Sequence, residues 1–297
     1  MKKITLQLVA FTLALFMMFA FTACEKEGVY NPKQKMKRVY DETPIGKILA
    51  QEWTWNKNQL EKIDYYSNNK IDYTERYSYE NNKVIKVEGG FYYYKVIYDG
   101  SKYQQIEFYF KGTLEESYRF EYENNKITKT TVTIYDNNSR GWKGGFLSSI
   151  LSIETIESIA KLVEKKNCSK ASTQIVTITY KYNGDNIVEQ TLSLITETGG
   201  IDVSHNVKIS YDKYDTKSNN PAYKFIEGGM ATSSKNLPLE MREVSTIIVG
   251  DLEPTISILK YEYSYSLEKN YPIEIRIKII DQDGEMYNST IYVEYQN

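Results

Sequence analysis

The chain has 297 residues, with 37 Lys and Arg against 39 Asp and Glu, and a formal net charge of −2. An evenly mixed charge this small does not support electrostatic capture of nucleic acid. One histidine and two cysteines cannot assemble a His-rich or Cys/His zinc site. We expect no bound metal and no other cofactor.

The first 24 residues predict an address in the cell envelope. Lys2 and Lys3 precede an apolar run over residues 4–21, and small residues follow it directly before Cys24. This order is typical of a secretory signal, and the cysteine makes it resemble the lipobox of bacterial lipoproteins. The resemblance implies that residues 1–23 are removed and that Cys24 is lipidated. A retained membrane anchor over residues 4–21 is the alternative.

After Cys24, the sequence predicts a flexible tether over residues 24–44 and then a single β domain over residues 45–297. The tether is rich in charge and contains Pro32 and Pro44. The anchor predicts an outer-membrane location, with either the periplasmic or the surface leaflet as its site. Twenty-eight tyrosines and many β-branched residues favour sheet in the domain.

An internal repeat predicts that the domain is built from hairpins. Each copy has an aromatic residue, an apolar or aromatic residue five positions later, and a long polar residue at plus seven. The pairs at the first two positions are Trp55 and Leu60, Tyr79 and Val84, Tyr98 and Tyr103, Tyr122 and Ile127, and Tyr182 and Ile187. Asn and Gly between them suit tight turns, because both tolerate positive φ. Alternating apolar and charged residues predict antiparallel strands with one buried face.

Two segments interrupt the hairpins. Over residues 146–166, apolar residues recur at spacings of three and four, which predicts an inserted amphipathic helix. Residues 218–238 are rich in Asn, Gly and Ser and predict a long loop. The expected fold is therefore all-β, an antiparallel meander that forms a curved sheet or a soluble barrel. Charged residues continue through the strands, where a lipid-facing band would be aliphatic.

Aromatic residues are the candidate ligand-binding residues. In the run from Phe91 to Tyr94, alternation places Phe91 and Tyr93 on one face and Tyr92 and Tyr94 on the other. One face can belong to the core, and the other needs a cover, which can be a ligand because aromatic rings stack on sugars. Trp53 and Trp55 share a face and receive the same interpretation. Aromatic pairs that merely stabilise the sheet are the alternative.

The tyrosine-rich hairpins of the Tyr-x-Tyr-x-Asn-Asn-Lys-Ile type, and the segment Tyr261–Tyr265 before Tyr271, resemble tyrosine-rich outer-membrane lipoproteins of Bacteroides-type bacteria. That family has no known function. The resemblance implies a porin-like, many-stranded β fold over residues 50–295.

The sequence favours a membrane-anchored, non-enzymatic binding lipoprotein whose ligand is a glycan, a peptide or a protein. The alternative is a structural or accessory subunit of an outer-membrane complex. A hydrolase is the least supported class, because His205 is the one histidine and has no nucleophile-elbow context. We expect His205 to be an exposed strand or loop residue. The sequence does not specify the oligomeric state.

Overall fold

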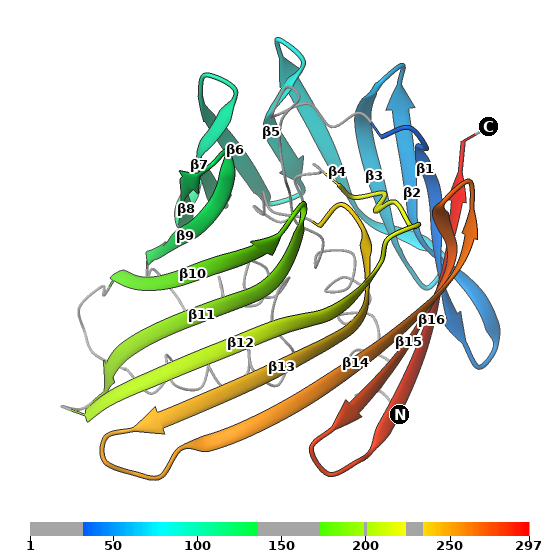
Figure 1. Ribbon diagram of the computed structural model, residues 1–297. Coiled ribbons are helices and arrows are strands. Elements are labelled where there is room, and N and C mark those ends of the chain that lie inside the picture. The colour runs from blue at the N-terminus through cyan, green and yellow to red at the C-terminus, as the bar shows by residue number, and fades with distance from the viewer. Residues whose placement is uncertain (1–31, 136–172, 199–200, 224–233, 297) are drawn as a thin grey trace.

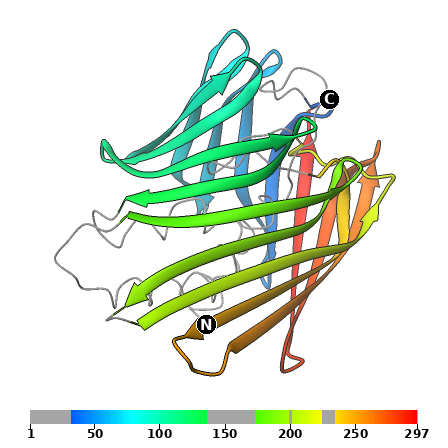
Figure 2. The ribbon, with the colours of Figure 1, turned by 60° about the vertical axis from the view of Figure 1, so that its left-hand side comes forward.

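Sixteen antiparallel strands form a closed barrel in the computed structural model of the protein (Figures 1 and 2). The structure describes residues 32–135, 173–198, 201–223 and 234–296. Each strand pairs with its neighbours in the chain, and β1 pairs with β16 to close the barrel. The strands are β1 Met36–Thr43, β2 Gly46–Asn56, β3 Gln59–Ser67, β4 Lys70–Glu80, β5 Lys83–Gly89, β6 Tyr92–Asp99, β7 Lys102–Phe110, β8 Thr113–Glu123, β9 Lys126–Tyr135, β10 Thr173–Asn183, β11 Asn186–Thr198, β12 Ile201–Asp215, β13 Leu237–Val249, β14 Thr255–Glu268, β15 Tyr271–Asp281 and β16 Met286–Tyr295.

The predicted hairpins are confirmed, and the register explains the five-residue spacing of the repeat. Tyr79 and Val84 are direct partners across the turn between β4 and β5, and the register shifts by a bulge immediately before Tyr79. Asn81 and Asn82 form that turn with φ of 50° and 64°. Both values are positive, as a two-residue turn of this type requires. The other four aromatic and apolar pairs of the repeat face each other in the same way.

The inner face of the barrel wall is mostly apolar, and much of the outer face is charged. Tyr118 and Val132 are fully buried partners on β8 and β9, and they belong to one continuous buried cluster. The outward residues of the same strands form cross-strand ion pairs, as Lys129 and Glu121 do at 2.8 Å. This arrangement follows from the alternation along each strand, since neighbouring residues point to opposite faces.

The two ends of the barrel differ in their hydrogen bonding. At one end, which we call the tyrosine rim, the short turns lie at 57–58, 81–82, 100–101, 124–125, 184–185 and 269–270. At the other end, the far rim, the turns include 44–45, 68–69, 90–91, 111–112, 250–254 and 282–285. In Figure 1 the tyrosine rim is at the top and the far rim is at the bottom.

At the tyrosine rim, an aromatic side chain on each even-numbered strand donates a hydrogen bond to a backbone carbonyl on the preceding strand. The donor and acceptor pairs are Trp55 to Met36, Tyr79 to Leu60, Tyr98 to Val84, Tyr122 to Tyr103, Tyr182 to Ile127, Tyr214 to Ile187, Tyr265 to Pro238, and Tyr295 to Pro272. Eight such bonds run around the whole rim. The abundance of tyrosine therefore has a structural reason beyond sheet propensity.

The predicted tether is too long, because residues 36–43 of it form β1, and the barrel begins before residue 45. The predicted helix over residues 146–166 lies outside the described residues. The described residues contain no α-helix, and no helix in this part of the chain is long and apolar enough to cross a membrane.

The predicted loop over residues 218–238 ends where β13 begins at Leu237. Its described part lies against the tyrosine rim. The amide of Asn219 donates to the carbonyl of Asn270 at 2.7 Å, and the amide of Lys235 donates to the carbonyl of Asp185 at 3.2 Å. Ser218 and Ser234 are almost fully buried. The loop thus joins two hairpins that are not neighbours in the barrel.

Candidate functional site

The structure divides the predicted aromatic residues between the two faces of the wall. Tyr92 and Tyr94 point inward, and Tyr94 is buried against Phe108 with ring centroids 5.0 Å apart. Tyr93 lies on the outer face, as alternation predicts. Phe91 lies in the turn before β6 and is 73% exposed.

Trp53 and Trp55 share the inner face, as predicted, with ring centroids 6.3 Å apart. Trp53 is buried, and its indole N–H donates to Gln51 at 3.0 Å. Trp55 is half-buried and takes part in the tyrosine rim. These two residues lie on β2, four strands away from Tyr92 on β6, so the predicted aromatic residues do not form one cluster.

On the outer face, Tyr93 forms a stacked pair with Tyr109. Tyr109 was not among the residues predicted from the sequence. Their ring centroids are 4.5 Å apart and their planes differ by 9°. The Lys86 ammonium lies 4.8 Å from the Tyr93 ring. The Tyr109 hydroxyl donates to Glu107 at 3.0 Å. Partial burial and this carboxylate raise the pKa of Tyr109.

Phe91 continues this surface toward the far rim. The Lys111 ammonium lies 5.5 Å from the Phe91 ring, and the Lys111 amide donates to the Phe91 carbonyl at 2.7 Å. Tyr93 on β6 pairs directly with Tyr109 on β7. The stacked pair therefore lies between Phe91 and the next outward pair of these strands, Lys95 and Glu107. We call Phe91, Tyr93 and Tyr109 the outer aromatic row.

Inside the barrel, Glu75 accepts hydrogen bonds from three tyrosines. Its Oε1 accepts from Tyr92 at 2.8 Å, and its Oε2 accepts from Tyr65 and Tyr77 at 3.0 Å each. Burial raises the pKa of Glu75, while the three hydroxyls lower it by a smaller amount. The side chain is 5% exposed. This cluster was not predicted from the sequence.

Gly89 makes room for the Tyr92 side chain in this cluster. A Cβ atom at Gly89 would lie 2.7 Å from both Cζ and Oη of Tyr92. Gly89 is the cross-strand partner of both Glu75 and Tyr92. Glycine at this position therefore lets the phenol cross the strand and reach the carboxyl group.

The prediction that His205 is exposed is wrong, since the imidazole is 1% exposed on the inner face of β12. Its Nε2 lies 2.7 Å from Ser245 Oγ. Burial lowers the pKa of His205 to about 4. The part of the chain that the structure describes offers Nδ1 no hydrogen-bond partner. A catalytic triad needs an acid at that nitrogen, so the described geometry of this pair does not assemble one.

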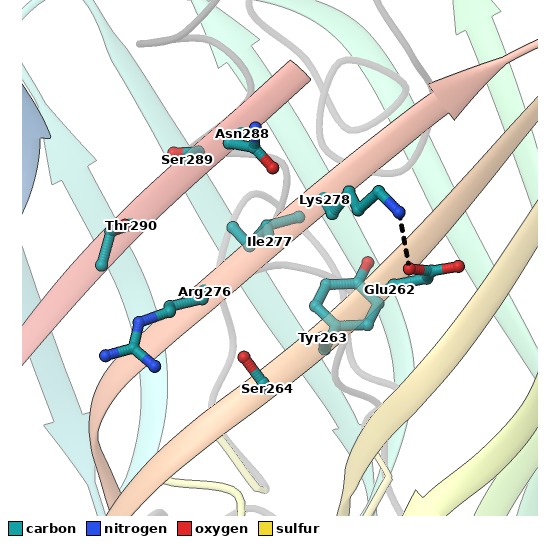
Figure 3. A pocket seen from close by; sticks show the side chains of 9 residues that line it. All are labelled: Glu262, Tyr263, Ser264, Arg276, Ile277, Lys278, Asn288, Ser289 and Thr290. Atoms are coloured by element: carbon teal, nitrogen blue, oxygen red, sulfur yellow. Dashed lines mark hydrogen bonds and ion pairs between the residues drawn. The ribbon is translucent and has the colours of Figure 1, made fainter. Parts of the chain in front are cut away.

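A hollow of about 490 Å³ opens on the wall over β14, β15 and β16 (Figure 3). Glu262 accepts from Lys278 at 3.2 Å and from Lys260 at 2.8 Å. Arg276 pairs with Glu274 at 2.9 Å. The lysine ammonium groups lower the pKa of Glu262. Because these charges are paired, the hollow is not a strong site for either an anion or a cation.

Within the described ranges, no three His, Cys, Asp or Glu side chains are grouped so that they could hold a metal ion. Cys24, the predicted lipidation site, lies outside the described residues.

No family model matches the chain, and no curated protein matches it. Among solved structures, the chain is similar to a porin-like protein from Bacteroides uniformis ATCC 8492, with a TM-score of 0.36 and 10% sequence identity. The alignment covers 90% of this chain and 100% of that chain. The resemblance to tyrosine-rich lipoproteins therefore stays a prediction, and the barrel fold rests on the strand pairing described above.

Proposed function

We propose that the protein is a lipid-anchored, non-enzymatic binding protein of the cell envelope that holds a glycan on the outer aromatic row. The signal-like segment and Cys24 support the anchor. β1 begins at Met36, so twelve residues span the distance from Cys24 to the barrel. At about 3.3–3.6 Å per residue, this chain can separate the barrel from the anchor by at most about 40 Å.

The charged outer face of the wall also supports attachment through an anchor. A transmembrane barrel carries an apolar band on its outer face, where Lys or Arg at the membrane centre costs about 2–4 kcal/mol. Here the outer face carries ion pairs such as Lys181 with Glu189 at 2.7 Å and Lys213 with Glu240 at 2.6 Å. Since this charged part of the outer face is poorly suited to lipid, an acyl group at Cys24 would supply the membrane affinity.

The observation that carries the binding proposal is the stacked pair of Tyr93 and Tyr109 on the outer face, next to the exposed ring of Phe91. Flat aromatic surfaces stack on the C–H faces of sugar rings. Because Tyr109 and the Lys86 ammonium cover the two faces of Tyr93, the sugar would stack on the exposed Phe91 ring and contact the edges of the stacked pair. Lys86 and Glu107 lie beside the pair and can hydrogen-bond to sugar hydroxyls.

A glycan array with the mature chain, residues 24–297, tests this proposal. We expect binding to at least one glycan, and we expect Tyr93→Ala and Tyr109→Ala each to weaken it at least tenfold without lowering the melting temperature by more than a few degrees. Tyr292→Ala is the matched control, because Tyr292 is an outer-face tyrosine on β16 with a lysine over its ring. A silent array, or equal loss of binding in all three variants, would contradict the proposal.

A further inference from the structure

The exposed apolar side chains of the described residues gather at one end of the barrel. Ten large hydrophobic residues are exposed in this part of the chain. Nine of them lie at the far rim or in the half of a strand next to it, and Ile273 is the exception at the tyrosine rim. Exposed hydrophobic residues that are scattered singly over a surface are normal in folded proteins. A concentration of them at one end of the barrel instead indicates a surface that contacts a partner.

Three of these nine residues, Ile195, Ile256 and Met286, lie on the outer wall over β11–β16 among less exposed apolar residues. Across these strands, Ser204 pairs with Ile248, Val244 pairs with Ile258, and Ile280 pairs with Met286. Direct partners in an antiparallel sheet lie on the same face about 5 Å apart. We call this surface the isoleucine face. It consists of Ile195, Val244, Ile248, Ile256, Ile258, Ile280 and Met286. Ile195 is 72% exposed, Met286 is 61% exposed and Ile256 is 51% exposed.

The turns that border the isoleucine face are acidic. Asp251 and Glu253 lie in the turn between β13 and β14, and Asp283 and Glu285 lie in the turn between β15 and β16. All four are exposed. The segments 244–259 and 279–287 contain no Lys or Arg. Outside these segments, Lys208 and Lys260 are the direct partners of Val244 and Ile280, and they form ion pairs with Glu189 and Glu262. Arg242 lies on β13 two residues from Val244, on the side of the face toward the tyrosine rim.

We propose that the isoleucine face is a docking surface for a partner protein whose contacting segment carries both apolar and basic side chains. The apolar area supplies the contact, and the acidic turns attract the basic residues and repel acidic competitors. The barrel is closed, so it has no free sheet edge, and the partner binds through side chains.

Charge also separates this occupant from two others. A membrane surface with anionic lipids would be repelled by the four exposed acids. A second copy bound by two-fold symmetry would bring identical surfaces together, and with them two sets of acidic turns. A basic partner is the occupant that turns these charges into an attraction.

The test uses the full chain and a synthetic amphipathic peptide of Leu and Lys, with a Leu and Glu peptide of the same pattern as the control. We expect the Leu and Lys peptide to bind at least tenfold more tightly by fluorescence anisotropy, with an affinity that falls as salt rises. The double variant Ile195→Ser with Ile256→Ser should weaken this binding at least tenfold, and Asp251→Asn with Glu253→Gln should weaken it at low salt. Ile273→Ser at the tyrosine rim is the control and should change the affinity less than twofold.

The substituted side chains are exposed, so the variants should keep the far-ultraviolet circular dichroism of the barrel. Equal affinity for the two peptides, or no effect of the Ile195 and Ile256 substitutions, would overturn the proposal. Two further results would overturn it in favour of another occupant. One is binding to phosphatidylcholine vesicles that the same double variant abolishes while the peptide is not bound. The other is a dimer of the full chain that the same double variant dissociates.

Discussion

Replacing Glu75 by Gln should change how the stability of the barrel depends on pH. Burial raises the pKa of Glu75, so the folded protein holds this proton at pH values where the unfolded chain, with a pKa of about 4.3, has released it. The contribution of Glu75 to the free energy of unfolding is therefore largest below a pH of about 4.3. It is lost as the pH rises through the pKa that Glu75 has in the folded protein. The loss amounts to about 1.4 kcal/mol for each unit by which the pKa is raised.

The Glu75→Gln variant has no such titration. At pH 4 the variant should be less stable than the wild type by about 1–3 kcal/mol. The reason is that the amide nitrogen of Gln cannot accept a hydrogen bond, whereas both carboxyl oxygens of Glu75 accept hydrogen bonds from tyrosine hydroxyls. This gap should shrink as pH rises toward 8.

Urea unfolding of both proteins between pH 4 and 8 measures the difference between their free energies of unfolding. The titration of all other groups is common to the two proteins and cancels in this difference. Glu189→Gln is a control of opposite sign. The lysines on either side of Glu189 lower its pKa, so the advantage of the wild type over that variant should be present at neutral pH and should disappear as pH falls. A gap between wild type and Glu75→Gln that is constant, or that widens with pH, would refute the reasoning.

Three further predictions follow from buried groups. Gly89→Ala should cost about 1–3 kcal/mol of unfolding free energy, because its Cβ would lie 2.7 Å from the Tyr92 ring, and the loss should be smaller when Tyr92 is first replaced by Leu. Tyr122→Phe should cost about 1–3 kcal/mol in urea unfolding, because the carbonyl of Tyr103 loses its donor; a loss below about 0.5 kcal/mol would contradict this. His205 should titrate near pH 4 in a heteronuclear NMR spectrum, where it is the one imidazole; a pKa near the ordinary value of about 6.5 would show that it is not buried.

Local features of the sequence predicted the local features of the fold. The repeat predicted the hairpins because its positions 1 and 6, such as Tyr122 and Ile127, are partners across a tight turn. Alternation predicted that Tyr93 and Tyr94 lie on opposite faces. It did not predict which face is the inner one, because that depends on closure between β1 and β16, which lie at opposite ends of the described chain.

The buried polar groups were missed for a related physical reason. A carboxylate or an imidazole is usually exposed, so His205 was predicted to be exposed and Glu75 was not predicted to have any special role. The alternation along each strand did indicate the face on which these two residues lie. Glu75 shares the parity of Tyr73 and Tyr77, and His205 shares that of Val203 and Val207, all on inner faces. The hydrogen bonds that make burial of Glu75 tolerable come from β3 and β6, and no local pattern specifies them.

We propose that an acyl group on Cys24, and not the wall of the barrel, holds the protein at the membrane. The direct test replaces residues 1–24 with a signal peptide that is cleaved without lipidation, and then separates membranes from soluble periplasm. We expect the wild-type protein in the membrane fraction and the replaced form in the soluble fraction, with the same far-ultraviolet circular dichroism as the wild type. A folded, exported form that lacks Cys24 and still remains in the membrane fraction would contradict the account.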